Sequence, residues 1–377
     1  MKVAILTEVL DRTDSKSGVP YYCEYLLRSL SKLEISDYLY LLRWYEKKNH
    51  IIYSRLKEIR VSSLALPKPF RDLIVIFELC YKIKKEKITV VHVLSPTVIG
   101  MIFLLLVNSK TILTVHDLYP FVFNLKLRFS LTNFKKWLIN KTKRILLLLI
   151  KKKIDKFIAV SKNTKEDLVK YLKISQDKVE VIYLAPDKEF RVKKFGVKRP
   201  NFVKEPFILA HHMGIGFIEI FYKLKMRGLQ HKLVIFGRTG KIREKILRLA
   251  SRLAVEDEIL FTGYISKQTV IDLYNRANLF VRYVGYEGFG LPVLEAMACG
   301  CPVIASKVGS LPEIVRGAGL LIDPKNKELW VKMIYRVLTN NKLRERLINK
   351  GLERAKKFSW DKVAQQTSNV YQQLQKT

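Results

Sequence analysis

Short apolar runs that end in polar residues alternate with amphipathic stretches along the whole chain. The runs cover residues 1–9, 90–96, 110–120, 157–161, 179–186, 207–212, 232–238, 258–264, 279–285, 301–306 and 319–324. Stretches between them carry apolar residues at helical spacing, as around Tyr21 to Leu33 and Lys162 to Leu172. Alternation of buried strands with helices is typical of α/β layers built on parallel sheets. The pattern therefore predicts an α/β fold.

The 377 residues are too many for one compact core and suffice for two domains of ordinary size. Between Pro186 and Pro206 the chain is charged and irregular, which is typical of a linker. We therefore predict two Rossmann-like domains, residues 1–190 and 191–357, whose parallel sheets face an interdomain cleft. The end of the chain, 358–377, is expected to form a helix that packs back on the first domain.

The chain carries 69 Lys and Arg against 34 Asp and Glu, a formal net charge of +35. Such a charge attracts phosphorylated small molecules, anionic lipid or nucleic acid, although a lysine-rich composition would produce it without any specific partner. No helix-turn-helix, RNP-like or zinc pattern accompanies the charge, which argues against a nucleic-acid partner. The four cysteines are interpreted as reduced thiols, and no signal-peptide core follows Lys2, so we expect a cytoplasmic protein.

Residues 126–156 combine charge with apolar side chains. They hold 11 Lys and Arg and a single acid, Asp155, interleaved with Trp137, Leu138 and the run ILLLLI. This run and VIGMIFLLLV (98–107) fall short of the roughly 20 residues that a membrane-spanning helix needs. One interpretation is a helix that attaches peripherally to an anionic membrane surface. The alternative is a solvated lysine face over an ordinary core helix.

An acidic, glycine-bearing segment runs from Glu287 to Ala298, EGFGLPVLEAMA. Seven residues separate Glu287 from Glu295, and Pro292 stands where a helix could begin. Glycines before a helix let backbone N–H groups approach an anion, and a nearby carboxylate can accept hydrogen bonds from sugar hydroxyls. A lone Glu is usually solvated surface, but this spacing within one strand–loop–helix favours a site.

The segment EGFGLPVLEAMACGCPVIASKVGSLPEI resembles the Glu-x7-Glu region of family-4 retaining glycosyltransferases. In the order of that family, TVHDLYP resembles its His-Asp loop, and AVSKNTKEDLVKYL with VEVIYLAPD resembles the segment before its linker. LVIFGR and LFTGYISKQTVIDLYNRANLFV resemble its donor-domain strands. The resemblance covers most of the chain and implies the GT-B fold, which consists of two Rossmann-like domains.

The resemblance also implies roles for individual residues. Glu295 would bind the donor ribose, Gly18 would face the diphosphate, and His116 would touch donor sugar or acceptor at the reacting centre, unless it only caps its loop. Residues expected to line the donor sugar and diphosphate are Glu287, with a catalytic role, and Gly288, Phe289, Gly290 and Leu291. Residues expected near the nucleobase are Gly263, Tyr264 and Ile265.

The chain departs from the family where an Arg and a Lys normally follow the first strand of the second domain. No Arg or Lys occurs between Phe207 and Tyr222, and His211 and His212 occupy this neighbourhood. Arg238 is the first candidate to replace the missing charge on the donor side, and Arg282 is the second. Each has the alternative of being a structural or surface arginine.

Together with these features, the resemblance implies a retaining glycosyltransferase that moves a hexose-type sugar from a UDP- or GDP-sugar to a glycan or lipid-linked acceptor. No Asp-x-Asp triplet occurs in the chain, so no metal and no other cofactor is expected. The alternative is a catalytically impaired GT-B homologue that binds nucleotide, glycan or a partner protein, because the usual Arg/Lys pair is missing.

Overall fold

The computed structural model describes residues 1–12, 18–43, 56–61, 68–122, 131–193, 203, 206–237 and 240–376. The chain divides into two compact units. The first unit holds residues 1–184 together with 360–377, and the second holds 185–359. The sequence placed these divisions at 190/191 and 357/358, a few residues from where the units divide.

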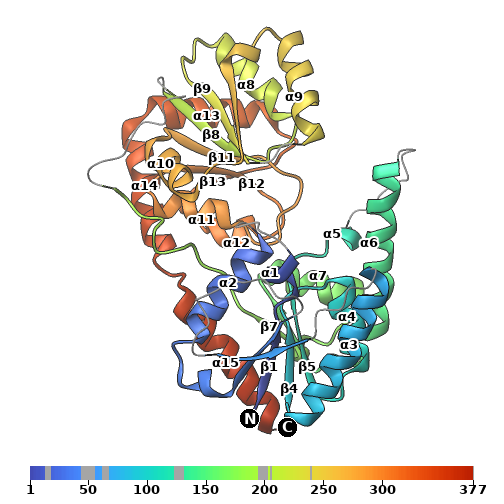
Figure 1. Ribbon diagram of the computed structural model, residues 1–377. Helices are drawn as coiled ribbons and strands as arrows, with labels where there is room; N and C mark the ends of the chain where they lie inside the picture. Colours follow the sequence, from blue (N-terminus) through green and yellow to red (C-terminus); the bar gives the residue numbers. More distant parts are fainter. Residues whose placement is uncertain are drawn as a thin grey trace. The chain divides into compact units, whose positions relative to one another are not determined.

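The first unit is built on a seven-stranded parallel sheet (Figure 1). Its strands are β1 (Val3–Leu6), β2 (Leu39–Arg43), β3 (Lys57–Arg60), β4 (Val90–Val93), β5 (Lys110–Val115), β6 (Lys156–Ala159) and β7 (Val179–Val181). They lie in the order β3-β2-β1-β4-β5-β6-β7. The apolar run over 110–120 predicted one strand, but β5 ends at Val115, and Tyr119 already begins α5.

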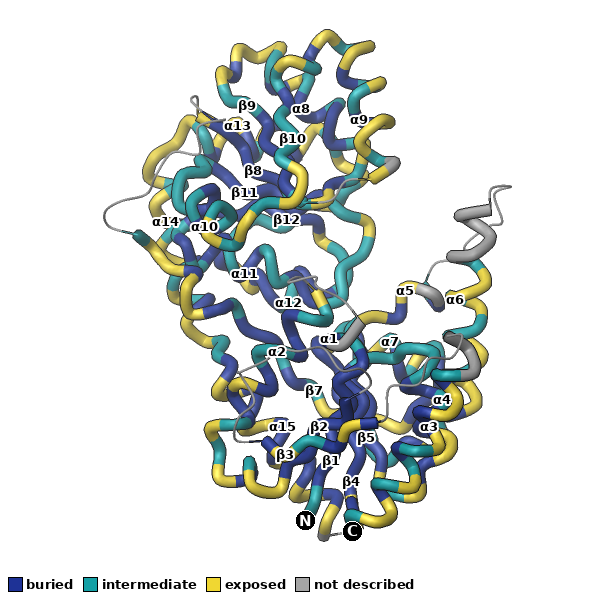
Figure 2. The backbone as a smooth tube through the Cα atoms, viewed as in Figure 1, coloured by how far each residue is buried: buried dark blue, intermediate teal, exposed yellow. Residues whose placement is uncertain are grey.

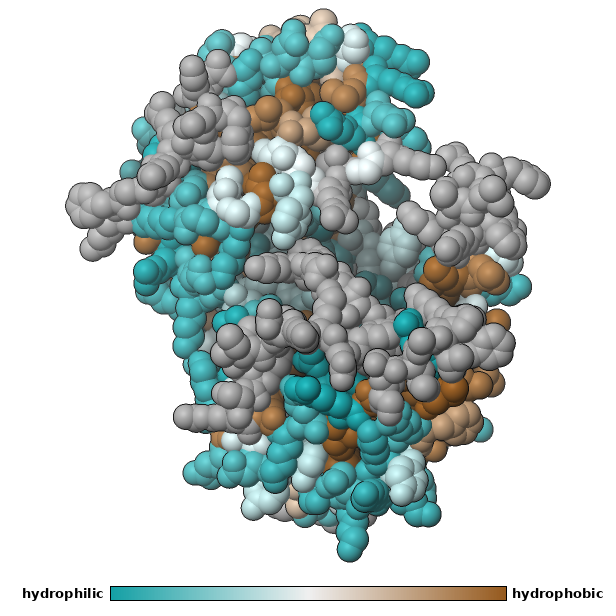
Figure 3. Space-filling view, viewed as in Figure 1, coloured by the Kyte–Doolittle hydropathy of each residue, from teal (hydrophilic) through white to brown (hydrophobic). Residues whose placement is uncertain are grey.

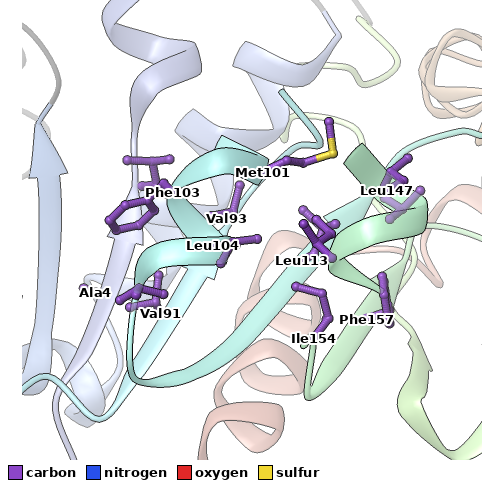
Figure 4. Close-up of a cluster of buried hydrophobic side chains, with 14 of the residues drawn as sticks. Ala4, Val91, Val93, Met101, Phe103, Leu104, Leu113, Leu147, Ile154 and Phe157 are labelled. Carbon is purple, nitrogen blue, oxygen red and sulfur yellow. The ribbon is translucent and has the colours of Figure 1, made fainter. Parts of the chain in front are cut away.

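Helices cover this sheet. They are α1 (Glu8–Arg12), α2 (Val19–Leu30), α3 (Lys68–Lys85), α4 (Val98–Leu106), α5 (Tyr119–Val122), α6 (Leu131–Ile150) and α7 (Lys162–Leu172). Short 3-10 turns span Glu34–Tyr38 and Gln176–Lys178. Side-chain caps fix two of the helix starts: Thr97 accepts from the Gly100 N–H, and Ser161 accepts from the Thr164 N–H. Between α4, α6 and the sheet, apolar side chains such as Phe103, Leu113 and Phe157 form a continuous core (Figure 4).

The final helix, α15 (Trp360–Lys376), belongs to the first unit and packs along α2. Trp360 stacks on Tyr25 of α2 at 5.5 Å between ring centroids. Deeper in the unit, the buried His92 of β4 bonds through Nδ1 to the Tyr371 hydroxyl and through Nε2 to the Thr114 hydroxyl, both at 2.8 Å. A residue near the end of the chain is thereby tied to the centre of the first sheet.

The second unit is built on a six-stranded parallel sheet in the order β10-β9-β8-β11-β12-β13. Its strands are β8 (Phe207–His211), β9 (Lys232–Phe236), β10 (Ile259–Gly263), β11 (Leu279–Arg282), β12 (Val303–Ser306) and β13 (Leu320–Ile322). Its helices are α8 (Phe217–Met226), α9 (Lys241–Arg252), α10 (Lys267–Arg276), α11 (Leu291–Ala298), α12 (Leu311–Val315), α13 (Lys327–Thr339) and α14 (Asn341–Ala355), with a 3-10 turn at Glu256–Glu258.

Burial separates sheet from helix in both units: the strands are mostly buried, whereas many helices expose one side (Figure 2). The predicted α/β fold with parallel sheets is confirmed in both units. Apolar runs form such strands because helices cover both faces of a parallel sheet, so that side chains on both faces are buried.

Candidate active site

Both sheets reverse their strand order beside their first strand. In the first unit β1 lies between β2 and β4, and in the second unit β8 lies between β9 and β11. At such a point the connections from two neighbouring strands run in opposite directions. The loops at the carboxyl ends of these two strands therefore diverge and leave a crevice. Ligands of open α/β sheets bind at these points, so the functional residues are expected there.

In the second unit, the acidic turn follows β11 directly. Residues 283–290 form a loop, and α11 begins at Leu291 with Gly290 as its N-cap and a proline in its first turn. Gly290 has φ 99°, and a Cβ there would lie 2.9 Å from Leu311 Cδ2. The helix thus starts at this point because residue 290 can adopt a left-handed conformation close to α12.

The backbone of Glu287 is held from the neighbouring loop. The N–H of Ser310 and its hydroxyl both donate to the Glu287 carbonyl, at 3.0 and 3.1 Å. Gly309, with φ 52°, passes directly beside the Glu287 backbone. The segment that resembles the family's Glu-x7-Glu region continues past Cys301 to Gly309 and Ser310, and these two residues fix the position of the acidic turn.

The carboxylate of Glu287 is bound by Arg282, the last residue of β11. Arg282 donates from Nε to Oε2 of Glu287 at 2.7 Å, and its Nη2 lies 2.6 Å from the same oxygen. Its Nη1 donates to the carbonyl of His211 and, at 3.3 Å, to that of His212. Arg282 is 9% exposed. The guanidinium therefore joins the ends of β8 and β11 to the acidic turn.

Two histidines complete this group at the end of β8. The rings of His211 and His212 lie edge to face at 4.2 Å. Burial lowers the pKa of both imidazoles, and the positive charge of Arg282 lowers each pKa further. Both rings are therefore neutral near pH 7. A Cβ on Gly237, after β9, would lie 3.1 Å from both rings, so this position also favours glycine.

Glu295 lies on α11, next to the hydroxyl of Tyr274 on α10. That hydroxyl donates to Oε2 of Glu295 at 3.4 Å. Burial raises the pKa of Glu295 to about 7; the hydrogen bond from Tyr274 opposes the shift, and the charge of Asp187 adds to it. The carboxyl group is thus poised to gain or lose a proton near neutral pH.

In the first unit, His116 follows β5. Its Nε2 lies 2.9 Å from the carbonyl of Leu94, which only accepts, so Nε2 carries the proton and Nδ1 keeps its lone pair. The ring lies edge-on to Tyr22, 4.8 Å between centroids. Burial lowers the pKa of His116, while the hydrogen bond to Leu94 and the charge of Asp117 oppose the shift. His116 is a neutral imidazole with an acceptor nitrogen.

The remaining predicted residues are less closely grouped. Gly18 precedes α2 with φ 66° and is exposed, and Gly263 ends β10 with φ 65°, where its carbonyl accepts from the Gly237 N–H. Tyr264 is 60% exposed, while Phe289 is buried against Phe358. Gly288 lies in the loop before α11, Leu291 is the first residue of α11, and Ile265 lies between β10 and α10. Arg238 lies outside the described residues.

In the second unit, the structure thus brings together Glu287, Arg282, His211 and His212. The bond between Arg282 and Glu287 was not predicted from the sequence, although the two residues lie five positions apart. Another unpredicted contact lies at the reversal point of the first sheet, where the Thr97 hydroxyl donates to Oε2 of Glu8 at 2.5 Å. Within the described ranges, no three His, Cys, Asp or Glu side chains are grouped as a metal site would require.

Two Rossmann-like units, one with an acidic turn at the reversal point of its sheet, define the GT-B class of glycosyltransferases. Residues 16–190 match the family model of glycosyltransferase family 4, and residues 214–354 match that of glycosyl transferases group 1. The chain therefore carries a glycosyltransferase family 4 domain followed by a glycosyl transferases group 1 domain, as the resemblance indicated.

Named relatives agree with this assignment. The chain is 38% identical over 160 residues to an O-antigen chain mannosyltransferase B of Escherichia coli, covering 42% of each protein. It is 33% identical over 230 residues to an uncharacterised glycosyltransferase of Methanocaldococcus jannaschii, covering 57% of this chain and 59% of that one. The matched parts thus span less than two thirds of the length of these relatives.

Solved structures match almost the whole chain. A sucrose-phosphate synthase from Thermosynechococcus elongatus superposes with a TM-score of 0.78 at 20% identity, covering 99% of this chain and 98% of that one. Anabaena HepE in complex with UDP and glucose superposes with a TM-score of 0.71 at 16% identity, covering 99% of both chains. At such low identity these matches establish the fold alone, and that fold is GT-B.

Proposed function

We propose that the chain transfers a hexose-type sugar from a UDP- or GDP-sugar to a glycan or lipid-linked acceptor, with retention of configuration and without a metal ion. The observation that carries this proposal is the fixed position of Glu287 at the reversal point of the second sheet. Its backbone is bound by Ser310 and its Oε2 by Arg282. Relatives named mannosyltransferases make mannose the first sugar to test.

The residues of the second unit suit the donor. As the glycosidic bond breaks, negative charge gathers on the nucleoside diphosphate, and N–H groups fixed in advance stabilise it. The turn Gly288–Gly290 and the N-terminus of α11 supply such groups. Glu295 would accept hydrogen bonds from the ribose hydroxyls, and Gly263, Tyr264 and Ile265 would lie near the base. Leu291 and Phe289 would line the sugar pocket with Glu287.

In the first unit, His116 suits a contact with a sugar hydroxyl. Its Nδ1 can accept a hydrogen bond because Leu94 fixes the proton on Nε2. The sugar develops oxocarbenium character during transfer, and a neutral imidazole adds no positive charge beside it. Gly18 would approach the diphosphate with its backbone. The proposed transfer uses no metal ion: the N–H groups of the turn and of the α11 N-terminus would stabilise the leaving diphosphate.

We further propose that the first unit attaches to an anionic membrane surface through α6. Among the described residues of α6, five large apolar side chains are exposed: Leu138, Ile139, Ile145, Leu148 and Leu149. Apolar side chains gather over this part of the unit (Figure 3). Lys141, Lys143, Arg144 and Lys151–Lys153 lie on or next to the same helix. Residues 126–130 and the side chains of 131–136 lie outside the description.

This combination of exposed leucines and lysines suits insertion into lipid headgroups better than a purely solvated lysine face. No helix in the described ranges is long and apolar enough to cross a membrane. Attachment at the inner face would bring a cytoplasmic enzyme to a lipid-linked acceptor.

A second candidate function is that of an impaired homologue which binds nucleotide or glycan without transfer. The observation that favours it is the end of β8 and the segment that follows, where His211 and His212 occur and no Arg or Lys comes before Tyr222. Neutral imidazoles stabilise a leaving diphosphate less than two cations do.

A thermal-shift screen followed by a transfer assay separates these functions. GDP-mannose, UDP-glucose, GDP and UDP are added to the full chain, and a ligand that binds only the folded state raises the melting temperature. Binding followed by sugar transfer to a lipid-linked or glycan acceptor supports the enzyme. Binding without transfer or hydrolysis supports the impaired homologue, and a flat screen across UDP- and GDP-sugars contradicts both.

A further inference from the structure

Arg282 makes contacts that none of the predicted roles requires. It ends β11, and in the sheet Val281 pairs with Ala210 of β8, so the ends of these two strands lie side by side. The side chain crosses this junction and reaches into the acidic turn. Only 11% of the Arg282 side chain and 16% of the Glu287 side chain are exposed. The pair is thus largely removed from water, where an ion pair with two hydrogen-bond donors is strong.

The guanidinium divides its donors between two tasks. Nε and Nη2 both contact Oε2 of Glu287, at 2.7 and 2.6 Å, while Nη1 is taken by the carbonyls at the end of β8. Oε1 of Glu287 makes no hydrogen bond within the part of the chain that the structure describes. One carboxylate oxygen is therefore fixed by the protein, and the other is left for a ligand.

The positive charge of Arg282 also affects how a diphosphate can bind beside Glu287. A nucleoside diphosphate carries at least two negative charges, and an uncompensated carboxylate beside it would repel it, more strongly in a site from which water is excluded. The guanidinium cancels the charge of Glu287. The neutral rings of His211 and His212 next to it cannot take over this task.

We propose that Arg282 is a positioning residue for Glu287, which holds Oε2, presents Oε1 to the donor sugar, and neutralises the carboxylate so that the donor diphosphate can bind beside it. This inference rests on the proposed function of the site. It assigns Arg282 a role through Glu287 and not as a direct ligand of the diphosphate, since Nε, Nη1 and Nη2 each contact a protein group.

Lysine cannot reproduce both tasks. Its ammonium is a single point charge, whereas arginine presents a planar fork that reaches two partners at fixed angles. Arg282→Lys should therefore keep the charge balance, and with it most of the nucleotide affinity, but lose the orientation of Glu287, and with it turnover. If Arg282 only held the two strands together, Arg282→Lys would lower stability, and nucleotide affinity and turnover would change together.

The test uses Arg282→Gln, Arg282→Lys, Glu287→Gln and the double variant Arg282→Gln/Glu287→Gln in the full chain. Arg252→Gln, on the exposed end of α9, is the matched control. GDP and UDP are the probes, their dissociation constants are measured by calorimetry, and kcat and KM are measured with the donor that the wild type uses. Circular dichroism and melting temperature identify variants that fail to fold.

Arg282→Gln should weaken nucleotide binding by on the order of tenfold or more. Glu287→Gln should keep the affinity but lose turnover, and the double variant should regain the affinity of Glu287→Gln without regaining turnover. If the double variant binds as weakly as Arg282→Gln, charge cancellation is wrong. If Arg282→Gln does not fold, Arg282→Lys decides, because equal losses of affinity and turnover overturn the proposal. A wild type that binds neither nucleotide overturns the proposed function instead, and this inference with it.

Discussion

Gly309 lies so close to the backbone of Glu287 that a Cβ at position 309 would be 2.3 Å from the Glu287 carbonyl oxygen and 2.9 Å from its nitrogen. Gly309→Ala must therefore displace the acidic turn. Gly317, with φ 77° and open space around it, is a matched control, because alanine there meets only the left-handed backbone strain of about 1–2 kcal/mol.

We expect Gly309→Ala to lower kcat/KM by on the order of 100-fold, since small displacements of catalytic groups have effects of this size. Gly317→Ala should lower the melting temperature and leave kcat/KM close to wild type. Steady-state kinetics and thermal denaturation of both variants provide the measurement. Equal kinetics in the two variants would show that the turn does not depend on Gly309.

Glu295 makes stability depend on pH in a predictable direction. Its pKa is raised by burial to about 7, whereas it titrates near its ordinary value of 4.5 in the unfolded chain. The folded state thus binds the proton more tightly than the unfolded chain does. The stabilisation that results is complete below pH 4.5 and is lost as pH rises towards and through 7. The free energy of unfolding falls by on the order of 3 kcal/mol over this range, because a pKa difference of one corresponds to about 1.4 kcal/mol.

Glu295→Gln removes this loss because the amide stays neutral. The variant should melt at a higher temperature than wild type at pH 8 and at nearly the same temperature at pH 5. Exposed Glu345→Gln serves as the control and should change neither value. The same variant should bind nucleotide more weakly, since an amide accepts fewer hydrogen bonds from ribose. A Glu295→Gln protein no more stable than wild type at pH 8 contradicts the raised pKa of Glu295.

His116 predicts a difference between two amide substitutions. Asparagine places its oxygen near the position of Nδ1, the proposed acceptor, whereas glutamine places its amide nitrogen near Nε2, which donates to Leu94. We expect His116→Asn to retain more kcat/KM than His116→Gln, and His116→Ala to lose on the order of 100-fold or more. The reverse order of Asn and Gln would assign the substrate contact to the other nitrogen.

The pH dependence of the same step follows from the lowered pKa of His116. The neutral ring is the active form, so protonation abolishes its acceptor. Because burial holds the pKa below 6.5, turnover should be insensitive to this group above that pH and should fall only in more acidic solution. The acid limb should disappear from the residual rate of His116→Asn.

Membrane attachment predicts that exposed residues of α6 matter in proportion to their apolar area. Ile145 and Leu149, four residues apart on one helix side, are 49% and 62% exposed. Replacing both with Asp should weaken sedimentation with anionic vesicles by on the order of tenfold or more, because apolar burial is lost and like charge is added. Met226→Asp, 66% exposed in the second unit, should bind as wild type does. Unchanged binding of the α6 variant would exclude this helix.

The features predictable from the sequence are those carried by short segments. The strands were found because apolar runs such as Val90–Val93 are buried on both faces, and the acidic turn was found because its glycines and glutamates lie within 12 residues. The roles assigned to Glu287, Glu295 and His116 remain predictions. Contacts between segments were not predictable: Tyr371 bonds His92 across 279 positions, and the proximity of Gly309 to Glu287 depends on how two loops pack. The pKa of Glu295 depends on burial, which no spacing reveals.

The placement of α15 has a consequence for how the protein is made. The first 184 residues leave the ribosome long before α15 does, because the whole second unit is translated in between. Until then the residues that pack against Val363, Val370 and Tyr371 stay uncovered, although these three side chains are buried in the complete unit. Until α15 is synthesised, the nascent first unit therefore exposes apolar surface, which favours aggregation.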